Sequence, residues 1–488
     1  MDHLPKHRLA RQVPCACCRR DFLRTVGAAA GSMVFLSASR IQSGTEGEAT
    51  DRKKGTATVR GAFLYPPSGT LRDEGYWSWP GSSFDAEGHH KSYMARIQAI
   101  ERELGMRIEM DGAPLDSEAG VSGFITAVKQ SRPDGLLLIP FKKSHWAHVT
   151  RIIEEVETPA VVLATLGVLL VDHINQLHRK SGVYLISAMD DLDAVRDGMK
   201  MIRTIRWMRD ARLLNLFGSE VKETILPHLG TQVRDVPLEE FYEEFRKTEA
   251  TAPVRQLARS YMDNAREAVE PTDADVVDAA RAYFALKQIL AREKGDALMM
   301  DCLPGLRHPR RHVPPCMGFM SLRDEGIPAG CQADLNPTLT MMLVQQLFDR
   351  PGFQQNAAMN TETNLYFGAH CTSPSKMNGV DAAPERYILR THAEAGWGCV
   401  PQVLFAPGQE VTMAQYFSGE DPRMLIYSGR VVRCHPKAAG GCRTNVEIKI
   451  NEVEDACETK GMHQIIFYGD HARQLRAFCQ LYGIEVIS

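Results

Sequence analysis

Polar side chains that could transfer a proton or bind a ligand gather in one stretch of the chain, residues 327–371. A short apolar run leads into a loop with Gln332 and Asp334, Asn336-Pro337 opens a helical pattern, and the stretch closes on His370 and a cysteine. Carboxylates and imidazoles are the usual groups of general acid–base catalysis. Because α/β proteins build ligand sites at the ends of strands, this spacing predicts a site there.

The acids nearest to this site in the sequence are Asp334 and Glu362. Two carboxylates can serve as general acid and general base when burial raises the pKa of one of them. Each also has a structural interpretation, because Asp334 directly precedes a helical segment and Glu362 lies in a Thr-Glu-Thr turn. We predict catalytic roles for both together with His370, and keep capping and a solvated surface as the alternative.

Several of these residues fall on the motifs of a known family. Gln332 stands two residues before Asp334, Gln355 two residues after a phenylalanine, His370 ends a Gly-Ala-His motif, and His463 precedes a Tyr-Gly-Asp turn. With these motifs the chain resembles the L-fucose/L-arabinose isomerase superfamily, which interconverts aldoses and ketoses around a divalent manganese-type ion. The likeness covers about residues 58–488 and is strongest over residues 315–371 and 461–487.

The resemblance implies a metal site whose four ligand positions are Gln332, Gln355, His370 and His463. Two of these positions hold an amide where the family has a carboxylate. Hard divalent cations are held mainly by anionic oxygen, so we expect the manganese-type site to be weak or lost. The resemblance also implies a trimeric or hexameric homo-oligomer, and it places His370, His463 and Asp334 together in a cleft between domains.

An aromatic and polar cluster follows the first expected strand and includes Trp77, Trp79 and His89. Aromatic faces pack on the apolar faces of sugar rings, and histidines bond hydroxyls, so we predict substrate binding by these residues and by Gln332. A loop packed at an oligomer contact is the alternative. Pro66-Pro67 stands where a glycine-rich phosphate loop would be needed, so no nucleotide cofactor is expected.

A second candidate binding surface comes from the segment Arg390–Glu394. Alternation on a strand would place Arg390, His392 and Glu394 on one face, where they could bind sugar hydroxyls. A solvated strand face explains the same pattern.

The composition excludes some classes of protein. Hydrophobic residues make up 44% and charged residues 24% of the chain, and the net charge is −3, which is typical of a globular protein and not of a nucleic-acid binder. Arg19-Arg20 followed by a run of small apolar residues resembles a twin-arginine export leader over residues 1–39. The run is too short to span a bilayer, so we expect periplasmic export without stable membrane insertion.

Beyond a polar linker at residues 40–57, we expect three domains because 488 residues are too many for one core. Buried apolar runs alternate with amphipathic helices over residues 58–209 and again over residues 210–370, which predicts two doubly wound parallel-sheet (Rossmann-like) α/β domains. Residues 371–488 hold short β runs with Gly and Pro breaks, which predict an antiparallel β barrel or sandwich.

These observations favour an exported carbohydrate-active protein that performs enediol-type aldose–ketose isomerisation, or a diverged form of it. Two alternatives stay open. One is a glycoside hydrolase or lyase that uses a carboxylate pair on the same fold, which export favours. The other is a non-catalytic sugar-binding protein, which the missing acids favour.

Overall fold

The computed structural model describes residues 54–74, 84–165, 168, 171–189, 191–435 and 441–487. The expected leader, most of the linker, Trp77 and Trp79 lie outside these residues. Within the described ranges, no helix has the length and apolar character needed to cross a membrane.

The first sheet is entirely parallel, with the order β2-β1-β3-β4-β5. Its strands are β1 (Thr58–Leu64), β2 (Arg107–Met110), β3 (Gly135–Pro140), β4 (Ala160–Thr165) and β5 (Val183–Ala188). Every residue of β3 and β4 is buried. This is expected of central parallel strands that are covered on both faces, and it confirms the predicted parallel α/β sheet.

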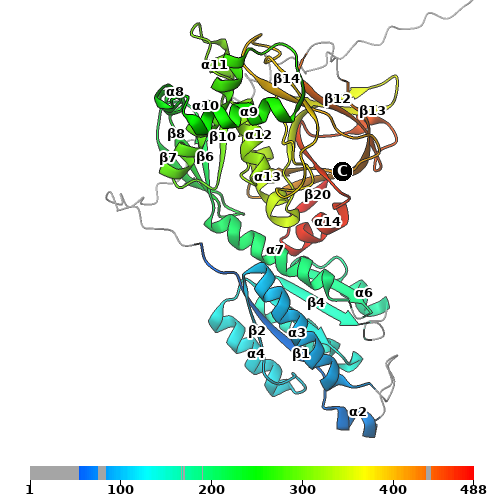
Figure 1. The fold of residues 1–488 in the computed structure, drawn as a ribbon. Helices are drawn as coiled ribbons and strands as arrows, with labels where there is room; N and C mark the ends of the chain where they lie inside the picture. Colours follow the sequence, from blue (N-terminus) through cyan, green and yellow to red (C-terminus); the bar gives the residue numbers. More distant parts are fainter. Residues whose placement is uncertain are drawn as a thin grey trace, which may run out of the picture. The chain divides into compact units, whose positions relative to one another are not determined.

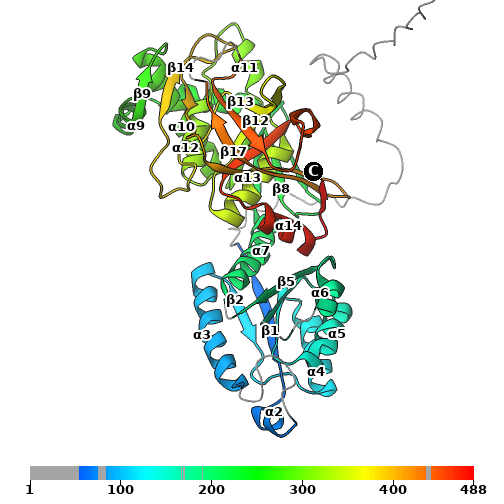
Figure 2. The same cartoon turned by 90° about the vertical axis from the view of Figure 1, so that its right-hand side faces the viewer.

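Alternate side chains of the first sheet pack into two separate hydrophobic cores. One core joins the sheet to α3 (Ala86–Leu104) and α7 (Asp193–Asp210), and the other joins it to α4 (Glu118–Ser131) and α5 (Trp146–Val156). Figure 2 shows α3 on one side of this sheet and α4, α5 and α6 (Val171–Leu177) on the other. The short helices α2 (Ser68–Glu74) and η1 (Lys143–His145) complete this part.

The second sheet has the order β11-β10-β6-β8-β7, in which only the edge strand β7 runs antiparallel among the described residues. Its strands are β6 (Arg212–Leu216), β7 (Lys222–Ile225), β8 (Gln232–Val236), β10 (Ala297–Met300) and β11 (Ala329–Cys331). The helices of this part are α8 (Leu238–Lys247), α9 (Ala252–Asn264), α10 (Asp273–Arg292), α11 (Leu303–Arg307), α12 (Cys316–Asp324) and α13 (Leu335–Phe348).

A closed antiparallel barrel of six strands follows, so the barrel alternative of the prediction is confirmed. Its strands are β12 (Phe353–Asn360), β13 (Leu365–His370), β16 (Glu410–Phe417), β17 (Arg423–Arg433), β18 (Thr444–Ile450) and β19 (His463–Tyr468). The barrel therefore begins with β12 and β13, ahead of the boundary expected at Cys371. These two strands were expected in the second α/β domain.

The remaining elements surround the barrel. A separate sheet joins β9 (Ala265–Ala268), β14 (Tyr387–Arg390) and β15 (Val400–Val403), and β20 (Glu485–Ile487) pairs in parallel with β17. The helical elements here are η2 (Ala456–Glu458) and α14 (Ala472–Leu481).

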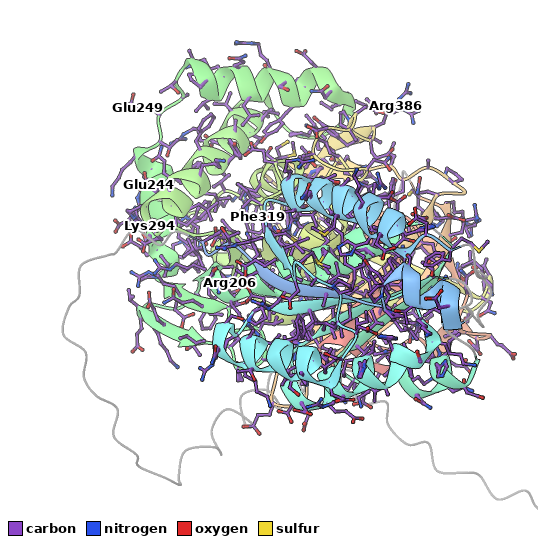
Figure 3. All side chains as sticks on the ribbon, turned by 90° about the horizontal axis from the view of Figure 1, so that it is seen from below. Arg206, Glu244, Glu249, Lys294, Phe319 and Arg386 are labelled. Carbon is purple, nitrogen blue, oxygen red and sulfur yellow. The ribbon has the colours of Figure 1, made fainter. Side chains whose placement is uncertain are left out.

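Helices α12 and α13 connect the second sheet to the barrel. Helix α13 packs against β10 and β11 of the second sheet and against β16 and β19 of the barrel. Figure 1 shows α13 between the green second sheet and the orange and red barrel. Nine of its fourteen residues are buried, as expected of a helix covered on more than one face. In Figure 3, Phe319 of α12 lies in the packed interior, whereas the exposed Glu249 and Arg386 lie at the outside. The loop between β11 and α13 is therefore held against the barrel.

Candidate functional site

A strained turn at the carboxyl end of β11 presents the first polar residues of the site. Gln332 and Ala333 both have left-handed backbone conformations, with φ of 60° and 48°. Such conformations cost free energy for residues other than glycine and tend to occur at functional sites. The turn is held by the Ala333 amide, which donates to Met300 O at 3.0 Å, and by the Asp334 amide, which donates to Cys331 O at 3.2 Å.

Asp334 directs its carboxylate away from the helix that follows it. It occupies the N-cap position of α13, yet its side chain makes no capping hydrogen bond. Its Oδ2 lies 2.6 Å from Nδ1 of His463, the first residue of β19. Capping therefore does not account for this acid in the structure.

His463 is held from both sides. Its Nδ1 contacts Asp334, and its Nε2 lies 2.8 Å from Oδ1 of Asn356 on β12. The contacts at both ring nitrogens hold the imidazole in one orientation between β12 and the Asp334 turn. The His463 side chain is 8% exposed and that of Asp334 is 34% exposed. The pair therefore extends from the partly exposed Asp334 carboxylate to the buried His463 ring.

His370 lies next to this pair at the end of β13. Its ring centroid is 5.8 Å from that of His463, with an angle of 76° between the rings. His370 is buried, and neither ring nitrogen has a hydrogen-bond partner among the described residues. Burial lowers the pKa of His370 well below its ordinary value, and the nearby basic groups of His463, Arg323 and His392 lower it further. The ring is therefore neutral, with both nitrogens open to a ligand or water.

The position of the turn depends on two buried side chains that seal the free edge of β11. Arg323 of α12 donates from Nε and Nη2 to Ala329 O, at 2.8 and 2.5 Å. Gln354 of β12 accepts from the Cys331 amide at 2.9 Å and donates to Cys331 O at 3.2 Å. These bonds satisfy backbone groups on the edge away from β10, and they tie β11 to the barrel just before Asp334.

Arg323 is also a source of positive charge in the interior. It is 1% exposed, and its Nη1 has no hydrogen-bond partner in the described part of the chain. Burial lowers its pKa, but an arginine keeps its proton in proteins. Arg323 is one of the groups that lower the pKa of His370, so its charge lies close enough to act on anything bound at the His370 ring.

Gln355, an expected metal ligand, does not join this group. Its Oε1 accepts from the Tyr366 hydroxyl at 2.7 Å and its Nε2 donates to Gln464 O at 3.4 Å, and the whole side chain is buried. Successive residues of a strand point to opposite faces, so Gln355 faces the barrel interior while its neighbours face outward. Asn356, which the sequence reasoning missed, takes the place beside His463.

Glu362 is not brought to the site either. It is exposed in the turn between β12 and β13, where its amide donates to Asn360 Oδ1 at 3.2 Å. Asn360 pairs with Leu365 at this end of the hairpin, and His370 lies at the opposite end of β13. At about 3.4 Å per residue, the strand separates the two by about 17 Å or more. A carboxylate pair of Asp334 and Glu362 is not formed.

The second predicted binding surface has a different geometry from the one expected. Strand β14 ends at Arg390, which forms an ion pair with Glu270 at 2.6 Å, so the residues after it do not alternate along a strand. His392 is buried, its amide donates to Trp397 O at 3.1 Å, and burial lowers its pKa. His392 is close enough to affect His370. Glu394 is exposed.

His89 belongs to the first sheet. It stacks on Phe84 with ring centroids 4.6 Å apart and meets Tyr93 and Phe141 edge-on. Phe141 follows β3, so this aromatic cluster lies at the carboxyl ends of β1 and β3, where the strand order of the sheet reverses. The expected partners Trp77 and Trp79 lie outside the described residues.

The donor atoms do not fit a manganese-type ion. Such an ion takes about six oxygen-rich ligands, whereas this group supplies one carboxylate. Both nitrogens of His463 are engaged, and Gln355 faces away. Across the described residues, no three His, Cys, Asp or Glu side chains are arranged to hold a metal.

No family model matches the chain, and a search of curated proteins finds no match. The function is therefore inferred from the motif residues of the chain and from the geometry of the site.

Proposed function

We propose that the chain is an enzyme of the L-fucose/L-arabinose isomerase type, which moves a proton between adjacent carbons of a sugar. One observation carries the proposal. An Asp334–His463 pair is held in place by Asn356, beside the neutral and unpartnered ring of His370. In this proposal the two sheets are two doubly wound domains, and the enzyme is an exported periplasmic homo-oligomer.

Isomerisation through an enediol needs a base that removes a proton next to a carbonyl and a group that stabilises the resulting oxyanion. The carboxylate of Asp334 is the base in this proposal, and His463 holds it in place through the contact between its Nδ1 and Oδ2 of Asp334. The partial exposure of Asp334 gives a sugar access to this carboxylate. The same carboxylate returns the proton to the neighbouring carbon, and the hydroxyl proton on the first carbon passes to the former carbonyl oxygen.

His370 and Arg323 supply the stabilisation of the oxyanion. A neutral imidazole can donate one hydrogen bond to a carbonyl oxygen and polarise it. Arg323 adds a buried positive charge, which acts strongly on a developing oxyanion because few water molecules screen it. No step of this mechanism passes through a metal ion.

The glycoside hydrolase alternative has less support. That chemistry needs two carboxyl groups about 5–10 Å apart. Asp334 is the one carboxylate in the group described above, and Glu362 lies at the far end of the β12–β13 hairpin.

A separate cavity favours a second candidate, a sugar-binding protein. This cavity has a volume of about 290 Å³, and its lining includes Tyr242, His312, Arg311 and Trp397. The Arg311 guanidinium lies 5.3 Å from the Trp397 ring centroid, and Tyr242 stacks on His312 at 3.9 Å. Aromatic faces of this kind suit sugar rings. Saturable binding that Trp397→Ala removes, without turnover of any sugar, would favour this candidate.

A panel of free aldoses and ketoses tests the enzymatic proposal, with products identified by NMR. We expect turnover of at least one sugar, and a loss of about 10²–10⁴-fold in Asp334→Asn and His463→Gln, which is typical of a lost general base. Glu362→Gln is the matched control and should keep full activity. Equal losses in Glu362→Gln and Asp334→Asn, or released reducing ends from glycosides, would contradict the proposal.

A further inference from the structure

Two thiols meet at the end of the barrel where His370 lies. Cys371 follows the last residue of β13, and Cys442 lies two residues before β18, the strand that pairs with β13. The two sulfur atoms are 3.5 Å apart, with Cys371 Sγ donating to Cys442 Sγ. Both cysteines are partly exposed, whereas Cys302, Cys316 and Cys331 are buried.

We propose that Cys371 and Cys442 form an oxidisable dithiol that closes to a disulfide and thereby changes how Asn356 holds His463. A disulfide bond is about 2.05 Å long, so the sulfurs must approach by about 1.5 Å. Side-chain rotation with a small shift of the two chain ends can supply this movement, because both cysteines lie just outside the paired residues His370 and Thr444.

Cys434 is the cysteine that precedes Cys442 in the sequence. In the structure the Cys434 thiol donates to Phe405 O at 3.6 Å, and Cys442 contacts Cys371 instead.

In the contact between the thiols, Cys371 donates to Cys442 Sγ. In the proposed exchange the accepting sulfur of Cys442 is the attacking group and Cys371 is the resolving group, since the thiolate is the nucleophile in thiol–disulfide exchange.

Oxidised glutathione serves as the oxidant in a balanced exchange. The Cys442 thiolate attacks one sulfur of oxidised glutathione, forms a mixed disulfide and releases one glutathione thiolate. Deprotonated Cys371 then attacks the Cys442 sulfur and releases the second glutathione. Two protein thiols and one oxidised glutathione give one protein disulfide and two reduced glutathiones.

The disulfide would act on the site through Asn356. Its Nδ2 donates to Cys442 Sγ at 4.0 Å, while its Oδ1 holds Nε2 of His463. Movement of the Cys442 sulfur toward Cys371 removes one of the contacts that fix the Asn356 amide. The effect on turnover rests on the proposed function, whereas formation of the bond and its effect on His463 do not.

The bond is tested by treating the reduced full-length protein with oxidised glutathione and mapping disulfides by mass spectrometry. We expect a peptide pair joined through Cys371 and Cys442, which dithiothreitol reverses. Cys371→Ser and Cys442→Ser should lack it, and Cys457→Ser, which removes an exposed thiol elsewhere, should keep it. Failure to form this pair, or preferential bonding of either cysteine to Cys316, would overturn the proposal.

The effect on the site is read in two ways. The His463 ring resonance, identified by its absence in His463→Gln, should shift on oxidation in the Cys457→Ser control and stay unchanged in Cys371→Ser. Turnover of the best sugar should fall at least tenfold on oxidation and recover with dithiothreitol. An unshifted resonance in the oxidised protein would refute control of the site. A shifted resonance in a protein that turns over no sugar would refute the enzymatic function and leave the dithiol standing.

Discussion

Replacement of Gln354 by methionine tests how the site is positioned. The Gln354 amide is fully buried and makes two hydrogen bonds to the backbone of Cys331, at 2.9 and 3.2 Å. Methionine has a similar volume but cannot make them, so Gln354→Met leaves the buried Cys331 N–H unsatisfied, whereas Cys331 O keeps the bond from the Asp334 amide. Such a group costs about 1–3 kcal/mol, and we expect the free energy of unfolding to fall by about 2 kcal/mol.

The assay is hydrogen exchange of peptides that cover β11 and the turn with Asp334. Because the Cys331 amide loses its acceptor, exchange through local opening should be faster in Gln354→Met by about 30-fold for about 2 kcal/mol of lost local stability. Gln355→Met is the matched control. It removes a bond to Tyr366 inside the barrel and should leave exchange at Cys331 unchanged. Faster exchange at Cys331 in the Gln355 variant alone would refute this account of the positioning.

Three further predictions concern other parts of the chain. Burial keeps His370 neutral in the folded protein, whereas the same side chain is protonated below about pH 6.5 in the unfolded chain, so the free energy of unfolding should fall as the pH drops below that value. In urea titrations, His370→Asn should lower the slope of the free energy of unfolding against pH by up to about 1.4 kcal/mol per pH unit. An unchanged slope would contradict this prediction. Gln355→Glu should lower the melting temperature, because it buries a carboxylate beside Tyr366, and calorimetry should show no gain of manganese binding. Tight manganese binding by this variant would support the metal site that the family resemblance implies. Changing Arg19 and Arg20 to lysine should leave precursor in the cytoplasm on fractionation, and normal yields of exported protein would exclude the twin-arginine leader.

The parallel first sheet could be predicted because its central strands carry a pure apolar signal. Gly135–Pro140 and Ala160–Thr165 are short unbroken runs between helical patterns, which at that length is typical of a strand covered on both faces. The start of the barrel was harder to predict. Strand β12 has the sequence Phe-Gln-Gln-Asn-Ala-Ala-Met-Asn, and its many amide side chains are more typical of a loop than of a buried strand.

The site could be predicted in part. The motif residues Asp334, His370 and His463 come together although Asp334 and His463 are 129 positions apart. The sequence did not show which residues of β12 face the site. A shift of one residue moves every side chain of a strand to the other face, and two adjacent glutamines do not reveal which of them faces inward. The Cys371–Cys442 contact could not be deduced, because cysteine spacing alone does not define pairing.

The most direct test of the central claim is proton exchange in D₂O. The protein is incubated with the sugar that it turns over best, and the proton on the carbon next to the carbonyl is followed by NMR. We predict deuterium at that carbon and at the neighbouring carbon of the product, with exchange about 10²–10⁴-fold slower in Asp334→Asn and His463→Gln. Full exchange in both variants, or saturable binding of sugars without exchange in the unmodified protein, would contradict the assignment of this pair as the proton-transfer site.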